Sequence, residues 1–172
     1  VQRHAPHHSI PGVEAVEHRA ERHVGHPQQR GRGRDALQLA RLLGSEGTVE
    51  AHDVRSAALD ELKVRAARAR LRNVRTTPDP TDSDYAGVLV DAPCTGVGTL
   101  RRRPEIGKRL TPADPARLAE LQVAILRGAA LRARPGGRVV YAVCSVLSEE
   151  AEQVVERVSD LLEPAAFDAE AA

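Results

Sequence analysis

Four residues with reactive or charged side chains lie where the sequence predicts strands to end. The carboxyl ends of parallel strands meet at one edge of a sheet, so we expect these side chains to face one another. A cysteine thiolate there can add to carbon 6 of a cytosine ring and turn carbon 5 into a nucleophile, which is covalent catalysis at an otherwise unreactive carbon. The four residues are Asp53, Asp91, Cys94 and Cys144.

Cys94 and Cys144 are the only two cysteines in a chain of 172 residues. They are too few for a disulfide framework, and their spacing does not match that of zinc ligands, so we expect free thiols in a reducing compartment. A free thiol has a pKa of about 8.5, so the site must favour the anion through nearby positive charge or backbone donors. The alternative is that both are small core residues, as many free cysteines are.

Strand and helix patterns alternate from residue 36 onward. The run Gly87-Val88-Leu89-Val90 is apolar throughout, as in a strand that is buried on both faces. Strands alternating with helices imply an α/β fold with a parallel sheet covered by helices on both faces. We expect strands at 48–53, 73–76, 87–90 and 138–142, and helices at 36–43 (ending at Gly44), 56–71 (capped by Ser56), 115–132 and 148–162 (capped by Ser148), with a turn at Gly136-Gly137.

The composition sets limits on the fold and the compartment. Apolar residues make up 41% of the chain and aromatic residues 2%, so the core must be built from Val, Leu, Ile and Ala. No run of about 18 apolar residues occurs and the start lacks a signal peptide, so we expect a cytoplasmic protein without a membrane span. The net charge of +1 says little about nucleic acid, because binding depends on how charge is clustered.

The amino-terminal segment differs from the rest of the chain. Residues 1–35 hold six of the seven histidines without a helical or strand period, so we predict an irregular or disordered segment. The histidine spacing is irregular, which favours incidental composition over a metal site, and we assign no metal. A boundary near residue 35 leaves 36–172 as one partial catalytic domain.

The segment 88–150 resembles the RNA cytosine-5 methyltransferases, and the enzymes of bacterial small-subunit ribosomal RNA look closest. The resemblance is carried by Asp91-Ala-Pro-Cys-Thr-Gly, Leu121-Gln122, Gly136-Gly137 and Tyr141-Ala-Val-Cys-Ser. It extends from about residue 37 to residue 158. It implies a Rossmann-like methyltransferase fold, S-adenosylmethionine as cofactor, and RNA, in particular ribosomal RNA, as partner.

The resemblance also implies roles for individual residues. Cys144 would attack the base, Cys94 would assist product release, and Asp91 would contact the base or the cofactor. Asp53 matches an acidic residue whose carboxylate can accept hydrogen bonds from both ribose hydroxyls of the cofactor, although a helix N-cap is the alternative. Asp79 stands where the family has an aspartate near the adenine, but its flanking prolines depart from the family pattern and favour a turn.

Basic side chains cluster directly after the Asp91 loop. Five cations stand against a single acid, Glu105, between residues 100 and 110, and such a cluster can contact RNA phosphates. A solvated loop is the alternative. Few aromatic side chains could stack on a flipped base, and Tyr85 and Tyr141 are the only tyrosines, so Arg planes would substitute. The five cations are Arg101, Arg102, Arg103, Lys108 and Arg109.

The sequence departs from the family before residue 37. The family has a strand and a glycine-rich cofactor loop there, whereas residues 28–35 hold glycines without a preceding apolar strand. We hypothesise that residues 1–35 come from a shifted reading frame or a rearranged gene start, and we expect a sheet that is incomplete at both ends. A catalytically inactive RNA-binding remnant is therefore the alternative function. A methyltransferase for small molecules is disfavoured, because it would not require two cysteines and a basic stretch.

Overall fold

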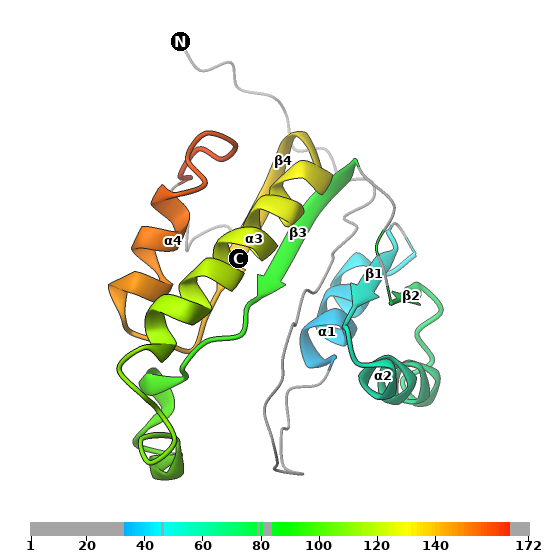
Figure 1. Ribbon diagram of the computed structural model, residues 1–172. Coiled ribbons are helices and arrows are strands. Elements are labelled where there is room, and N and C mark those ends of the chain that lie inside the picture. Colours follow the sequence, from blue (N-terminus) through cyan, green and yellow to red (C-terminus); the bar gives the residue numbers. More distant parts are fainter. Residues whose placement is uncertain (1–32, 46, 79, 81–83, 166–172) are drawn as a thin grey trace.

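The structure is a computed structural model that describes residues 33–45, 47–78, 80 and 84–165. Strands and helices alternate along this part of the chain (Figure 1). The strands are β1 (Val49–His52), β2 (Val74–Thr77), β3 (Tyr85–Asp91) and β4 (Ala133–Ala142). The helices are α1 (Arg34–Leu43), α2 (Ser56–Arg68), α3 (Asp114–Arg132) and α4 (Glu152–Glu156), with short 3-10 helices η1 (Val97–Thr99), η2 (Pro104–Ile106) and η3 (Ser148–Glu150).

The described strands form two parallel pairs. β1 pairs with β2 in one sheet, and β3 pairs with β4 in another. The hydroxyl of Tyr85 on β3 donates a 2.7 Å hydrogen bond to Glu50 Oε1 on β1, which links the two pairs. The alternation of parallel strands with helices confirms the predicted α/β class, and the described sheet is divided rather than continuous.

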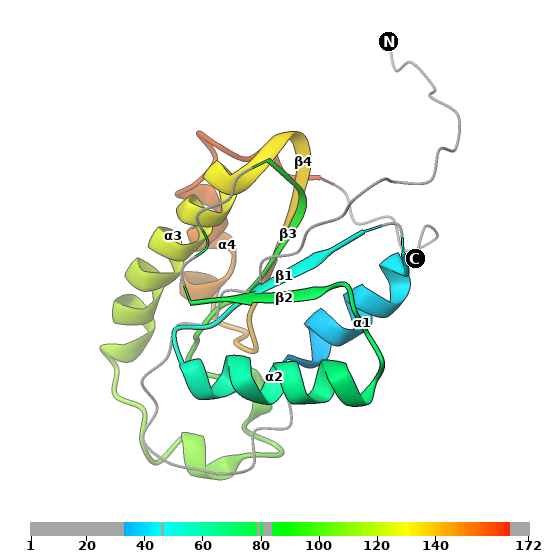
Figure 2. The same cartoon turned by 90° about the vertical axis from the view of Figure 1, so that its right-hand side faces the viewer.

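Helices α1 and α2 pack on the β1–β2 pair (Figure 2). Small apolar residues of α1, among them Ala36 and Ala40, pack with Val49 and Ala51 of β1 and Leu62 of α2. Apolar burial of this kind is worth roughly 25 cal/mol per Å².

The side chain of Asn73, just before β2, closes the carboxyl end of α1. Its Nδ2 donates to the backbone carbonyls of Ala40 and Gly44, each at 2.8 Å. A helix ends with carbonyls that have no partner inside the helix, so Asn73 fixes where α1 stops. The predicted end of this helix at Gly44 is confirmed, with Gly44 as the C-cap at a φ of 56°.

Helix α3 covers one face of the β3–β4 pair, and α4 packs beside α3 (Figure 1). Val88 and Val90 of β3 share a buried core with Leu126 of α3 and Val154 of α4. On β4, by contrast, Val140 is 52% exposed. The prediction that helices cover both faces of the sheet is therefore wrong for this pair, as far as the described residues go.

Several predicted boundaries shift for local reasons. Ser56 is the first residue of α2 rather than its cap, because Arg55 occupies the N-cap position. The helix ends at Arg68 instead of residue 71, and Arg70 takes a left-handed φ of 56°. Helix α1 begins at Arg34, two residues before the expected boundary.

The final helix was predicted over 148–162, and this prediction is wrong. The chain forms η3 and then breaks at Ala151, where φ is −118° and ψ is −94°, before the five-residue α4. The expected Gly136-Gly137 turn is present as an irregularity inside β4, with Gly136 at a φ of 75°. Opposite it, the pairing shifts register between Tyr85 and Gly87.

Most of the predicted amino-terminal segment, residues 1–32, lies outside the described residues, and its irregular character stays a prediction. Within the described ranges, none of the helices has the length and apolar character needed to cross a membrane. The same residues hold no group of three or more His, Cys, Asp or Glu side chains that could bind a metal ion.

Candidate active site at the ends of β3 and β4

The two cysteines lie side by side. Cys94 follows β3, which ends at Asp91, and Cys144 follows β4, which ends at Ala142. Because Asp91 and Ala142 are partners in the parallel register, the loops that leave the two strands start at the same edge of the sheet. The Sγ atoms of the two cysteines are 3.2 Å apart. The structure thus brings together two predicted site residues, Cys94 and Cys144, and a third, Asp91, ends the strand that leads to Cys94.

Backbone hydrogen bonds hold the Cys144 loop against the Cys94 loop. The amide of Cys144 donates to Cys94 Sγ at 3.2 Å, and the amide of Gly98 donates to the Cys144 carbonyl at 3.1 Å. A Cβ at Gly98 would lie 3.0 Å from that carbonyl oxygen and 3.3 Å from a methyl group of Val146. Residue 98 therefore needs to be glycine for this close approach.

The two thiols differ in their surroundings. Cys94 is half-buried, whereas Cys144 is exposed. A hydrogen bond with the Cys144 thiol, burial and the charge of Cys144 together raise the pKa of Cys94 above that of a free thiol. At neutral pH Cys94 is therefore a thiol, and Cys144 is the sulfur that a large substrate can reach.

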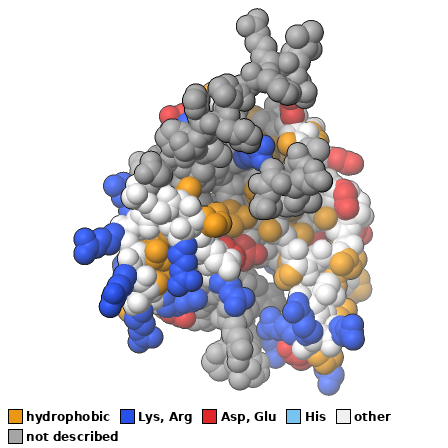
Figure 3. Space-filling view, turned by 180° about the vertical axis from the view of Figure 1, so that it is seen from behind, with side chains coloured by type: hydrophobic (Ala, Val, Ile, Leu, Met, Phe, Trp, Pro, Cys, Tyr) orange, Lys and Arg blue, Asp and Glu red, His pale blue; other side chains and the backbone are white. Residues whose placement is uncertain are grey.

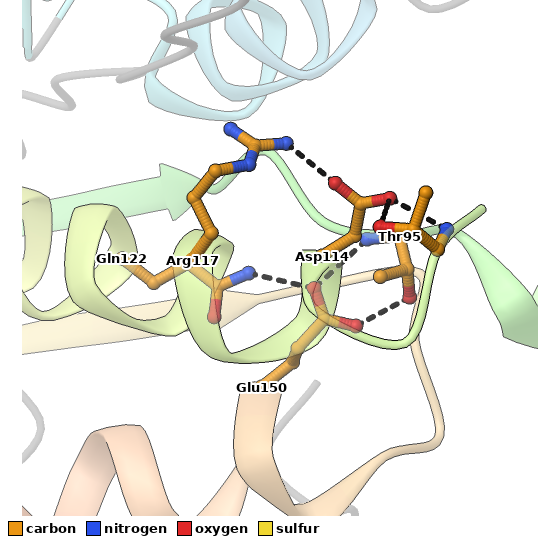
Figure 4. Close-up of polar contacts among 6 residues, drawn as sticks. Thr95, Asp114, Arg117, Gln122 and Glu150 are labelled. Atoms are coloured by element: carbon orange, nitrogen blue, oxygen red, sulfur yellow. Dashed lines mark hydrogen bonds and ion pairs between the residues drawn. The ribbon is translucent and has the colours of Figure 1, made fainter. Parts of the chain in front are cut away.

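The buried carboxylate of Glu150 binds the residue that follows Cys94. Glu150 is fully buried, and its Oε1 accepts the amide of Thr95 at 2.8 Å while its Oε2 accepts the Thr95 hydroxyl (Figure 4). Gln122, also fully buried, donates its Nε2 to Glu150 Oε1 at 3.1 Å and to the carbonyl of Pro93 at 2.7 Å. Thr95 and Pro93 flank Cys94 on either side.

The sequence pattern predicted no role for Gln122 or Glu150. One signal was available in the sequence. Gln122 lies on the same face of α3 as Leu118 and Leu126, four residues before and after it, and both are buried. A polar residue in the apolar stripe of a helix needs a buried partner, so its position indicates a buried network.

The two tyrosines are engaged in hydrogen bonds. Tyr85 is fully buried, so its ring cannot stack on a base. Tyr141 is half-buried and donates its hydroxyl to the Glu150 carbonyl at 2.8 Å. Burial, Cys94 and Glu150 raise the pKa of Tyr141, so it stays a neutral donor.

Asp53 lies at the carboxyl end of the other strand pair, after β1. Its Oδ1 accepts both the amide and Nε of Arg55, at 2.9 and 3.0 Å, and its Oδ2 accepts Arg55 Nη2 at 2.8 Å. The alternative role of Asp53 as the N-cap of α2 is wrong, because Arg55 holds that position. A carboxylate has about four lone-pair sites, so the Asp53 oxygens still have room for a further donor. Asp79 lies outside the described residues.

The basic cluster follows η1 in the chain and lies on both sides of η2. All five of its cations are exposed, and Arg103 Nε lies 3.5 Å from Glu105 Oε1. Lys and Arg side chains gather in two areas on the face shown in Figure 3. Because the amide of Gly98 binds the Cys144 carbonyl, the start of the loop is attached to the cysteine site. The cluster residues are Arg101, Arg102, Arg103, Lys108 and Arg109.

Comparison with known proteins gives a consistent family. A model of the family described as 16S rRNA methyltransferase RsmB/F matches residues 31–166. The ribosomal RNA small subunit methyltransferase B of Thermus thermophilus is 54% identical over 68 residues, which are 40% of this chain and 17% of the relative.

Two solved structures are similar over most of the chain. A methyltransferase homolog protein from Pyrococcus horikoshii is 27% identical with a TM-score of 0.69, over 87% of this chain and 45% of that chain. NSun6 from the same organism, solved with SFG, is 26% identical with a TM-score of 0.65, over 83% of this chain and 35% of that chain. The chain thus spans less than half the length of each of these proteins.

Proposed function

Since this chain belongs to the 16S rRNA methyltransferase RsmB/F family, we propose that it transfers a methyl group from S-adenosylmethionine to carbon 5 of a cytosine in ribosomal RNA. The observation that carries this proposal is the pair of sulfur atoms 3.2 Å apart, of which only Cys144 is exposed. A pair of thiols at one position suits a reaction in which one sulfur forms a bond to the base and a second group assists its release.

We assign bond formation to Cys144. Its thiolate sulfur forms a bond to carbon 6 of the ring, and the displaced electron pair makes carbon 5 a nucleophile that takes the methyl group. Transfer of the carbon 5 proton to solvent water then restores the ring double bond and expels the Cys144 thiolate. Cys94, within hydrogen-bond distance of that sulfur, is placed to assist this release.

The described residues fit one end of the cofactor. S-adenosylmethionine would supply the methyl group as an electrophile when bound. Asp53 is suited to the ribose, because its buried carboxylate stands at a strand end and its oxygens can accept a hydroxyl donor. Asp91 is suited to a contact with base or cofactor, because it ends β3 three residues before Cys94. Asp79 stays a candidate for the adenine from the resemblance alone.

RNA would approach over the basic cluster. Its exposed cations can neutralise phosphates, and η1 links the cluster to the backbone of Cys144. This arrangement would bring a bound strand to the exposed thiol.

The test is methyl transfer by the purified chain. Unmethylated small-subunit ribosomal RNA would be incubated with methyl-labelled S-adenosylmethionine, and the nucleosides would be analysed by mass spectrometry. We expect labelled 5-methylcytidine. Folded protein that binds this RNA but shows no calorimetric heat with S-adenosylmethionine would instead favour the alternative, a catalytically inactive RNA-binding remnant.

A further inference from the structure

Two buried polar side chains hold the backbone on both sides of Cys94. Gln122 on α3 donates to the carbonyl of Pro93. Glu150 at the end of η3 accepts the amide of Thr95 (Figure 4). The residues before and after the cysteine are therefore fixed by two different elements. Because Gln122 also donates to Glu150, these two anchors are joined.

The same network reaches the loop that carries Cys144. The carbonyl of Glu150 accepts the hydroxyl of Tyr141, three residues before Cys144. The hydroxyl of Thr95 lies 3.3 Å from the hydroxyl oxygen of Ser145, the residue after Cys144. A displacement of Glu150 would thus act on both cysteine loops at once.

The orientation of the Gln122 amide is set by its neighbours. Both groups near its Nε2 are acceptors, the Pro93 carbonyl and the Glu150 carboxylate. Reversing the amide would place Oε1 against those two oxygens. With Nε2 facing these acceptors, Gln122 Oε1 is buried without a hydrogen-bond partner among the described residues, and an unsatisfied buried acceptor destabilises the fold.

A buried carboxylate and a half-satisfied amide are poor choices for stability alone, since apolar residues of similar volume often replace buried ionic groups without loss. Here every hydrogen bond of the Gln122 and Glu150 side chains joins these two residues to each other or to a residue adjacent to Cys94. We propose that Gln122 and Glu150 are positioning residues that set the separation of the Cys94 and Cys144 sulfurs. The use of that separation in catalysis rests on the function proposed above.

The test measures the separation of the thiols directly. Phenylarsine oxide forms two As–S bonds with a pair of neighbouring thiols and releases one water, so its affinity reports whether two sulfurs lie within reach of one arsenic atom. It requires neither RNA nor S-adenosylmethionine. The dissociation constant would be measured by competition with a small dithiol, and folding would be followed by circular dichroism melting.

Three substitutions separate positioning from bulk stability. Gln122→Leu removes both hydrogen bonds in a similar volume, and we expect arsenical affinity at least about tenfold weaker. Glu150→Ala should weaken it by as much or more. Glu150→Gln should stay within about threefold of the wild type, because the amide oxygen can accept Thr95 and Gln122 while its nitrogen donates to the Thr95 hydroxyl. Glu149→Ala, an exposed neighbour in η3, is the matched control and should behave as wild type.

Wild-type arsenical affinity in folded Gln122→Leu would overturn the proposal. If Gln122→Leu or Glu150→Ala does not fold, Thr95→Val decides, because it keeps the side-chain shape and removes only the hydroxyl shared by Glu150 and Ser145. Weaker affinity there supports the proposal, and unchanged affinity overturns it.

Failure of the proposed function would look different. A wild-type chain that binds the arsenical, and loses this binding in Gln122→Leu, but never methylates cytosine, would keep the positioning role and lose the methyltransferase assignment. A Gln122→Leu variant that methylates cytosine as well as the wild type, at unchanged arsenical affinity, would keep the function and lose the positioning role.

Discussion

The sulfur atoms of Cys94 and Cys144 lie 3.2 Å apart, although 50 positions separate these residues in the chain. The parallel register between Asp91 and Ala142 explains this closeness, because it starts both loops at one sheet edge. A base bonded to one sulfur would therefore lie next to the other. The pair has different exposure, and this difference predicts different phenotypes for the two cysteine variants.

The first prediction contrasts those variants. Cys144→Ala removes the sulfur that bonds to the base, so methyl transfer should fall by more than about 10³-fold. Cys94→Ala leaves bond formation possible and impairs release, so protein should accumulate covalently on RNA. The adduct would be seen as a shifted band in a denaturing gel that disappears after ribonuclease treatment.

The double variant Cys94→Ala/Cys144→Ala serves as the control and should show no adduct. Unchanged turnover in Cys144→Ala would sink the assignment of the nucleophile. An adduct that forms with Cys144→Ala but not with Cys94→Ala would reverse the two roles.

The second prediction concerns the pH dependence of Cys94. The Cys144 hydrogen bond, burial and the charge of Cys144 raise its pKa, and only a thiolate is alkylated. At a pH of about 8.5, near the pKa of a free thiol, less than half of Cys94 is ionised. Removing the Cys144 sulfur in Cys144→Ala removes the first and third causes, so the pKa of Cys94 should fall and its alkylation should speed up.

The measurement is the rate of iodoacetamide labelling of the Cys94 peptide by mass spectrometry between about pH 7 and pH 10. We expect the rate profile of Cys144→Ala to move to lower pH, with labelling at about pH 8.5 faster than in the wild type. Identical profiles would mean that burial alone sets the ionisation of Cys94.

Most of the regular secondary structure could be predicted from the sequence. The four strands and the first three helices appear close to their expected places, because apolar periodicity and glycine punctuation are local signals, except that β4 begins at Ala133 instead of residue 138. The last helix failed at Ala151, whose backbone angles break it, and nothing in its residue type signals such a break. The prediction that helices cover both faces of the sheet failed at the exposed Val140, because the number of layers over a strand depends on elements far away in the chain.

The candidate site was predictable only in part, for a related reason. Cysteines at strand ends are visible in the sequence, since each strand end is local. The contacts that hold them are not local, because Thr95 and Glu150 are 55 residues apart and Gln122 and Glu150 are 28 apart. The pairing of Arg55 with Asp53 is local in the chain. It could not be predicted for a different reason, because it depends on side-chain geometry that residue types do not specify.

The third prediction tests Asp53 as a ribose acceptor. Asp53→Ala removes a carboxylate, and hydrogen bonds to a charged group contribute about 1.5–3 kcal/mol, so S-adenosylmethionine should bind about 10- to 100-fold more weakly. Calorimetric titration of the folded variant measures this loss. Asp60→Ala is the matched control, because Asp60 is exposed on α2, where its Oδ1 accepts Lys63 Nζ at 3.0 Å, and it stands away from the strand end.

Unchanged affinity in Asp53→Ala would leave Asp53 as a structural partner of Arg55. Asp53→Asn refines the result. It preserves the shape and an acceptor oxygen but removes the charge, so an intermediate affinity would indicate that the charge contributes to binding.

The last prediction concerns the basic cluster and its response to salt. Each phosphate neutralised by a cation contributes about 0.7 to 0.9 to the slope of log affinity against log salt concentration. Replacing Arg101, Arg102 and Lys108 by Ala should therefore lower the slope for RNA binding by about two and weaken binding at low salt. We leave Arg103 unchanged because Glu105 already lies 3.5 Å from it.

The control for this experiment removes equal charge elsewhere. Arg68 ends α2, Arg72 lies between α2 and β2, and Arg75 lies on β2, and all three are exposed. Their triple replacement therefore lowers the net charge equally without touching the loop next to Cys144. Filter binding across a salt series would give both slopes. A larger decrease for the loop variant places RNA phosphates on the cluster, because a general charge effect would change both slopes alike. Equal decreases, or none, would make the cluster an ordinary solvated loop and would require another route for RNA to the exposed thiol.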